Sequence, residues 1–223
     1  MRRFLPFIIV ALVGFITVGA GTILYRSKRP TTLRISEEKG AEQEKPGSIH
    51  VRGPAQAPVT LEEFGDFQCP PCGKLSGALL EIEKDYGPKL RMIFRNFPFP
   101  NHQHALEAAY TAEAAGLQGR YWEMHDLLYR EQSNWSNAPD VKQLFVSYAK
   151  ILGLEIDRFE TDIAGPTVKA RVIADQERGK SLGVNATPSI FINNQGVPPD
   201  SLNPIALRAA IDEALKEKEK PTS

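Results

Sequence analysis

The chain has 223 residues, 27 basic residues balance 27 acidic ones, and 42% of the residues are apolar. Six of the basic residues precede the first acid, so the chain after position 34 holds 21 basic and 27 acidic residues, a net charge of −6. This balance argues against a nucleic-acid-binding function. The roughly 175 residues beyond position 47 are enough for one compact globular unit.

The first predicted element is a membrane segment. Residues 4–25 carry no charge and would span about 33 Å as a helix, enough to cross a bilayer. We interpret residues 1–25 as a transmembrane anchor or uncleaved signal. The alternative is a secretory signal removed near Ala20. The basic residues on both sides of this segment do not set its orientation. Residues 26–47 are polar and predict a flexible linker, too short for a dimerisation domain, so we expect a monomer.

Next, a strand and a helix are predicted on either side of a turn. Residues 58–64 are rich in β-branched and aromatic residues, which is typical of a strand. Apolar side chains then recur at helical spacing from Leu75 to Tyr86, and Gly87 follows. The turn contains Cys69-Pro70-Pro71-Cys72, which places Cys69 at the helix N-terminus. We expect Asp66 to organise this turn.

Cys69 and Cys72 are the only cysteines of the chain. Closing so short a loop as a structural staple would contribute only about 2 kcal/mol. Zinc needs four ligands, and no histidine has a ligand spacing to the pair; the four are His50, His102, His104 and His125. We interpret His102 and His104 as solvated side chains rather than a metal pair, and we expect no cofactor. The pair therefore predicts thiol–disulfide exchange.

The position of each cysteine predicts its role. The free amides and dipole of the helix N-terminus favour a thiolate at Cys69, whereas Cys72 lies one turn further in and should be better buried. We expect Cys69 to be the attacked sulfur and Cys72 to resolve the mixed disulfide. Pro70 and Pro71 each remove an amide donor from the neighbourhood of Cys69, which predicts an intermediate reduction potential.

The rest of the chain predicts a helical stretch between strands. Residues 89–97 should form a strand, and residues 102–182 four helices, of which the third begins at Pro139. A last helix is expected at residues 203–216. The resulting domains are residues 48–98 with 187–216, an inserted helical subdomain at 99–186, and a disordered tail at 217–223.

A later segment completes the pattern. Thr187-Pro188 precedes an apolar strand, and Glu63 lies six residues before Cys69. Together with the Cys69–Cys72 motif on a strand-to-helix turn, these residues resemble the DsbA-like thiol–disulfide oxidoreductase family from about Val59 to Ala214. The resemblance implies an α/β thioredoxin fold with a helical insertion.

The resemblance also implies roles for three residues. Pro188 matches the family's cis-proline, which lies against the cysteines and leaves the preceding backbone free to pair with an extended substrate. Thr187 matches the residue that faces the sulfurs. Glu63 matches a buried acid that shuttles a proton beneath the disulfide. Because alternate strand residues face opposite sides, a register error of one residue would give this role to Glu62.

We therefore expect an extracytoplasmic thiol–disulfide oxidoreductase, anchored in the cell membrane by residues 4–25. The first hypothesis is a dithiol oxidase that acts on reduced, folding proteins and is reoxidised by a membrane redox partner. The alternatives are a reductase in cytochrome or copper-site assembly, and a metal-binding or chaperone-like module that uses the cysteines as ligands. The extracytoplasmic location follows from this function, because a disulfide donor belongs in an oxidising compartment.

Overall fold

The structure is a computed structural model that describes residues 50–220. The predicted anchor and linker lie outside the described residues. The elements, in chain order, are β1 (His50–Arg52), β2 (Val59–Gly65), α2 (Pro70–Tyr86), η1 (Gly87–Lys89), β3 (Leu90–Asn96), α3 (Ala105–Gly116), α4 (Tyr121–Arg130), α5 (Gln132–Trp135), α6 (Lys142–Ile151), α7 (Ile156–Ala164), α8 (Pro166–Ser181), β4 (Ser189–Ile192), β5 (Gln195–Gly196), η2 (Pro199–Ser201) and α9 (Pro204–Glu219).

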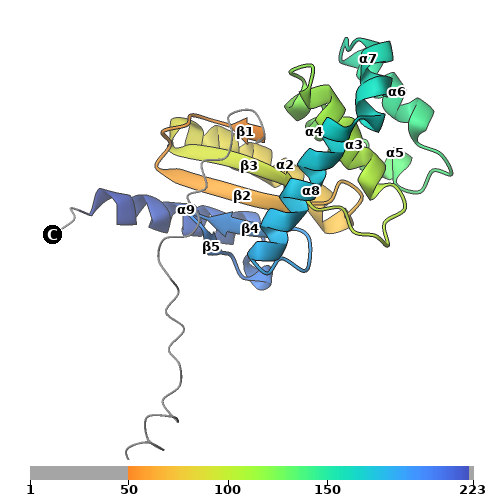
Figure 1. Ribbon diagram of the computed structural model, residues 1–223. Helices are drawn as coiled ribbons and strands as arrows, with labels where there is room; N and C mark the ends of the chain where they lie inside the picture. Colours follow the sequence, from red (N-terminus) through yellow and green to blue (C-terminus); the bar gives the residue numbers. More distant parts are fainter. Residues whose placement is uncertain (1–49, 221–223) are drawn as a thin grey trace, which may run out of the picture. The chain divides into compact units, whose positions relative to one another are not determined.

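Within residues 50–220, five strands form one sheet in the order β1-β3-β2-β4-β5 (Figure 1). The two central strands, β2 and β3, run parallel, and the other neighbours are antiparallel. Glu63 lies opposite Phe94 on one side and Ile190 on the other. Because β2 is paired along both edges, its register and therefore the face of each side chain are fixed.

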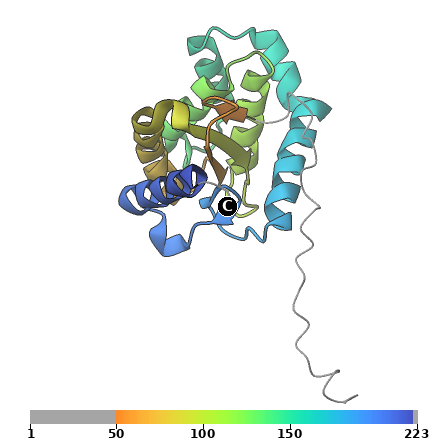
Figure 2. The ribbon, with the colours of Figure 1, turned by 90° about the vertical axis from the view of Figure 1, so that its left-hand side faces the viewer.

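Helices cover both faces of the sheet, with α9 and α8 on opposite sides (Figure 2). Leu61 of β2 packs in one core with Leu79 of α2 and Leu207 of α9. On the other face, Phe64 and Phe97 pack together, and a Cβ on Gly179 of α8 would lie within 2.6 Å of the Phe97 ring. Only glycine lets α8 approach the sheet this closely.

Helices α3 to α8 lie between β3 and β4 in the sequence and form a helical insertion whose aromatic core continues into Phe67, Phe94 and the two cysteines. Trp135, Phe145 and Phe159 are all buried in that core. The fold is therefore an α/β thioredoxin-like fold with a helical insertion, as the sequence predicts. None of the helices between residues 50 and 220 combines the length and the hydropathy of a membrane span.

Some boundaries differ from the sequence prediction. Helix α6 begins at Lys142 rather than at Pro139, because the Asp140 side chain accepts a hydrogen bond from the Lys142 amide and holds the preceding residues in a turn. The predicted start of the disordered tail at residue 217 is wrong, because α9 continues to Glu219. Lysine and glutamate are good helix formers, and they extend the helix. The short elements α5, α7, β1 and β5 have no counterpart in the prediction.

A buried charge network joins α8 to the sheet. Arg95 of β3 donates to Glu62 at 2.9 Å and to Asp175 of α8 at 3.1 Å. Arg178 of α8 reaches the other oxygen of Glu62 at 3.3 Å. Ionised groups are buried at tolerable cost only when they are paired in this way. The network therefore fixes the last helix of the insertion on the face of the sheet that carries Glu62.

Candidate active site

The two cysteines lie where β2 leads into α2. Cys69 is the N-cap residue of α2, and Pro70 and Pro71 occupy its first turn. Both thiols are free and both cysteines are buried: Cys69 is 6% exposed and Cys72 is fully enclosed. Cys69 is therefore only slightly accessible to solvent, but it is the more exposed of the two thiols. Pro70 and Pro71 are exposed beside it.

The loop before β4 lies against the outer sulfur. Cys69 Sγ donates a hydrogen bond to the Thr187 carbonyl oxygen at 3.3 Å. The peptide bond between Thr187 and Pro188 is cis, and both residues are half-buried. Residues 118 positions apart in the sequence are therefore brought together at the thiol.

The two thiols have opposite acidities. The pKa of Cys69 is lowered to about 6, chiefly by a hydrogen bond from Cys72, with a smaller contribution from Thr187. The pKa of Cys72 is raised, first by its burial, then by its hydrogen bond with Cys69 and by the charge of Glu63. At neutral pH the dithiol therefore holds its negative charge on Cys69 and its proton on Cys72.

Glu63 and Glu62 face opposite sides of β2. Glu62 pairs with Arg95 and Arg178 on the α8 face. Glu63 faces the cysteines: it is 3% exposed, and burial followed by the charge of Cys69 raises its pKa to about 8. Strand alternation thus separates a carboxylate held by two arginines from a carboxylic acid that is mostly protonated at pH 7.

Asp66 organises the turn, as the sequence predicts. It is buried, and one oxygen accepts the Gln68 amide at 2.7 Å. The other oxygen accepts the Phe99 amide at 2.9 Å and lies 2.7 Å from His102 Nδ1. The backbone of Asp66 accepts the Cys69 amide at 3.0 Å. A short side chain thus ties the cysteine turn to the segment after β3.

Two glutamines connect the cysteine turn to the helical insertion. Gln132 of α5 donates to the carbonyl of Phe67 at 2.7 Å and to that of Cys69 at 3.0 Å. Gln68 donates to the Ser136 carbonyl at 2.6 Å. A Cβ on Gly73 would lie 2.4 Å from Gln132 Oε1, so this glycine leaves room for the Gln132 side chain. These contacts join residues more than 60 positions apart, and sequence spacing gives no sign of them.

The prediction of solvated histidines is wrong for His104, which is 4% exposed. Its Nε2 lies 2.7 Å from the Ala138 carbonyl, and its amide donates to Gln68 at 2.6 Å. The start of α3 packs against the segment between α5 and α6, and this contact removes His104 from water. His102 keeps partial exposure but pairs with Asp66. Across residues 50–220, no three His, Cys, Asp or Glu side chains are grouped to hold a metal ion.

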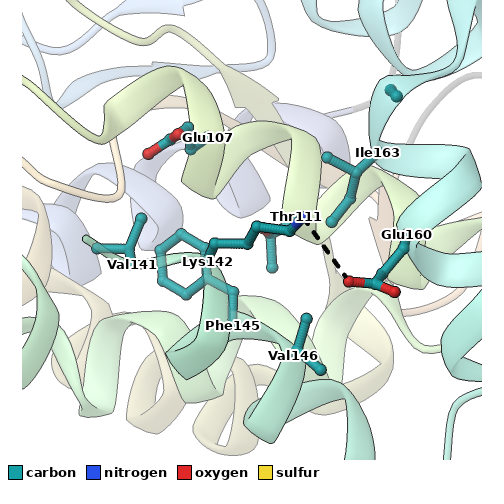
Figure 3. Close-up of a pocket in the computed structure, with 9 residues that line it drawn as sticks. Glu107, Thr111, Val141, Lys142, Phe145, Val146, Glu160 and Ile163 are labelled. Carbon is teal, nitrogen blue, oxygen red and sulfur yellow. Dashed lines mark ion pairs between the residues drawn. The ribbon is translucent and has the colours of Figure 1, made fainter.

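A cavity of about 320 Å³ lies within the insertion between α3, α6 and α7 (Figure 3). Apolar side chains such as Phe145 and Ile163 line it, and Lys142 Nζ lies 4.0 Å from Glu160 Oε1 across it. It shares no residue with the cysteine site, so the thiol chemistry does not involve it directly.

Comparison with known proteins agrees with this geometry. A family model described as thioredoxin matches residues 45–213. A solved structure of a thioredoxin-like oxidoreductase from Silicibacter pomeroyi is 26% identical, with a TM-score of 0.64 over 76% of this chain and 93% of that one. BdbD from Bacillus subtilis is 23% identical, with a TM-score of 0.69 over 76% and 94%. The thiol-disulfide exchange protein alpha-DsbA2 from Wolbachia pipientis is 20% identical, with a TM-score of 0.63 over 74% and 87%.

Some relatives by sequence are named as antiporters rather than as oxidoreductases. Sequences named Na(+)/H(+) antiporter NhaA 1 from Salinispora arenicola and Mycolicibacterium gilvum are 39% and 38% identical over 76% and 67% of this chain. The chain spans only about a quarter of their length, 25% and 24%. Antiport is therefore not assigned to this chain.

The fold and the cysteine pair define a thioredoxin-fold protein equipped for thiol–disulfide exchange. The chain belongs to the thioredoxin family, and its fold resembles the folds of BdbD and alpha-DsbA2.

Proposed function

We propose that this protein is a dithiol oxidase that donates a Cys69–Cys72 disulfide to folding proteins. The observation that carries the proposal is the acidity of the outer thiol, whose pKa is lowered to about 6. A stabilised thiolate favours the reduced form of the pair, and a protein whose reduced form is favoured oxidises its partners.

The reaction then proceeds in two exchanges. A substrate thiolate attacks Cys69 Sγ, the Cys69–Cys72 bond breaks, and Cys72 leaves as a thiolate that takes a proton from Glu63. A second substrate thiolate attacks the substrate sulfur of the mixed disulfide, and Cys69 leaves as a thiolate. The substrate loses two electrons and the cysteine pair gains them. A membrane redox partner would then take up these electrons.

Thr187 and Pro188 are proposed to position the substrate. The Thr187 carbonyl lies beside Cys69 Sγ, and the loop leads directly into β4. A substrate segment that extends this strand pairing would bring its sulfur to Cys69. Pro70 and Pro71 complete the exposed rim on the other side of the thiol.

The reduction potential tests the direction of electron flow. Because the two prolines withhold amide donors while Cys72 supplies a hydrogen bond to the Cys69 sulfur, we expect a value between about −270 mV for thioredoxin and about −120 mV for DsbA. Equilibration with glutathione buffers, followed by alkylation, measures it. A value at or below about −270 mV would overturn the oxidase and favour a reductase in cytochrome or copper-site assembly. Metal titration of the reduced protein tests the metal-binding alternative.

We further propose that the catalytic domain is extracytoplasmic and monomeric, held at the membrane by residues 4–25. A disulfide donor functions in an oxidising compartment. Membrane fractionation, combined with labelling of intact cells by a membrane-impermeant thiol reagent, tests this placement. Recovery in the soluble fraction with a new N-terminus near residue 20 would show signal cleavage instead.

A further inference from the structure

Glu63 Oε1 and His125 Nε2 are buried polar atoms without a hydrogen-bond partner among residues 50–220, and Tyr129 Oη, close enough to Cys72 to feel its charge, is another. Glu63 and His125 are 3% and 7% exposed. Buried polar atoms nearly always bind another protein group or an ordered water. Glu63 comes from β2 and His125 from α4, so two separate elements each direct an unsatisfied polar group into the interior.

Both residues line the same cavity, whose volume is about 10 Å³. This is close to the space that a single water needs. Phe94, Leu79 and Trp122 form apolar walls around it. Arg52 and Ser76 also line it. A water in this cavity can hydrogen-bond both Glu63 and His125, which satisfies the two unpartnered atoms at once.

The other nitrogen of His125 leads towards the surface. His125 Nδ1 lies 2.9 Å from Asp126 Oδ1, and Asp126 Oδ2 accepts a hydrogen bond of 2.7 Å from Arg52. The Asp126 side chain is 27% exposed. The imidazole therefore stands between the buried cavity and a solvent-accessible carboxylate.

The surroundings of His125 allow it to change protonation. Burial is the largest influence and lowers its pKa; Arg52 and His50 act in the same direction, whereas Asp126 opposes them. The aromatic rings around it are neutral and include Tyr121 and Tyr129. The ring is thus neutral at rest, and a carboxylate stands ready to stabilise the imidazolium.

We propose that one water in this cavity joins Glu63 to His125, and that His125 relays the proton of Cys72 between Glu63 and solvent. The inference rests on the proposed proton transfer between Glu63 and Cys72. His125 is a positioning residue, because it acts through the water and through Glu63 and does not touch the sulfurs.

The proton balance closes over a full cycle. When the disulfide is reduced, Cys72 takes a proton from Glu63, Glu63 takes one from the water, and the water takes one from His125 Nε2. Before it releases that proton, His125 gains one on Nδ1 from solvent at Asp126, so the ring passes through the imidazolium that the Asp126 carboxylate stabilises. On reoxidation the same protons move outward, so the imidazole returns to its starting tautomer.

The test is the rate at which dithiothreitol reduces the disulfide of the full chain, measured between pH 6 and 9. His125→Phe should slow reduction about tenfold near pH 7, and the ratio of its rate to the wild-type rate should fall with rising pH, because Glu63 is ionised more often and is no longer reprotonated quickly. His125→Gln keeps a polar group for the water but cannot relay a proton, so it should be slow as well.

Tyr121→Phe is the matched control, since it removes a buried hydroxyl that likewise has no partner within residues 50–220 but does not line the cavity. It should retain the wild-type rate and pH profile. If His125→Gln keeps both, the histidine has only a structural role and the relay is wrong, whatever the stability of His125→Phe. The assay is independent of the oxidase assignment, because a strongly reducing potential would refute that assignment and leave the rate comparison intact.

Discussion

Replacing Glu63 by glutamine should stabilise the reduced protein at neutral pH. The pKa of Glu63 is raised from 4.5 to about 8. Below pH 4.5 the side chain is protonated in both the folded and the unfolded state. Above it, the unfolded chain loses a proton that the folded protein keeps, so the wild type loses stability up to about pH 8.

At about 1.36 kcal/mol per pH unit, the loss reaches ~3 kcal/mol at pH 7 and ~5 kcal/mol at pH 8. Glutamine does not titrate, so Glu63→Gln should exceed the wild type by amounts of this order, and the gain should vanish near pH 4.5. Urea denaturation at several pH values measures the free energy of unfolding. The same variant should also exchange disulfides more slowly near neutral pH.

The neighbouring residue supplies the control. Glu62→Gln should destabilise the protein by about 1–3 kcal/mol, because it removes the carboxylate that Arg95 and Arg178 share, while Arg95 keeps its ion pair with Asp175. Equal stability of wild type and Glu63→Gln at pH 8 would refute the argument from burial. A gain in Glu62→Gln instead would mean that the two glutamates have been assigned to the wrong faces.

Three further predictions concern the cysteine turn. Cys72→Ala should accumulate mixed disulfides with substrates through Cys69, seen on non-reducing gels, because Cys72 is no longer present to resolve them. Pro71→His should add a positive neighbour to Cys69 and make the potential less negative, with each 30 mV corresponding to about 1.4 kcal/mol in a glutathione equilibrium. Gln132→Ala should lose two hydrogen bonds to carbonyls of the turn and cost about 1–3 kcal/mol in urea denaturation.

Each of the three has its own control. Cys69→Ala should trap no substrate, and trapping by Cys69→Ala instead would reverse the two roles. Pro71→Ala restores only the amide donor near Cys69, so comparison with Pro71→His separates the effect of the amide from that of the histidine charge. If the reduction potential of both variants is unchanged or more negative, electrostatics at the helix N-terminus does not set the potential. Gln176→Ala, which loses one hydrogen bond to the Pro98 carbonyl, is the comparison for Gln132→Ala. If Gln132→Ala costs no more stability than Gln176→Ala, the two hydrogen bonds from Gln132 do not hold the cysteine turn in place.

Local signals were enough to predict the strand, the turn and the helix that carry the cysteines. Helix α2 begins at Pro70 and ends at Tyr86, because proline suits the first helical turn and Gly87 adopts a positive φ of 48° just beyond the last residue. The two-residue alternation of β2 likewise placed Glu63 and Glu62 on opposite faces. In each case the determining residues are close together in the sequence.

The supports of the site could not be predicted in this way. Gln132 reaches Cys69 across 63 positions, and His104 reaches Ala138 across 34. A polar residue near a helix end is usually solvated, and only the packing of the insertion against the turn decides otherwise. His125 belongs to the same group, since its position in the sequence cannot show that it shares a cavity with Glu63.

The contacts of Gln68 and Gln132 make the helical insertion one wall of the thiol site. Two members of this family with the same Cys-Pro-Pro-Cys segment therefore need not share a reduction potential or a reaction rate. A substitution in α5 that shifts Gln132 would alter the backbone that presents Cys69 while leaving the motif untouched. Divergence in the insertion thus offers a route to new redox behaviour in which the reacting residues themselves do not change.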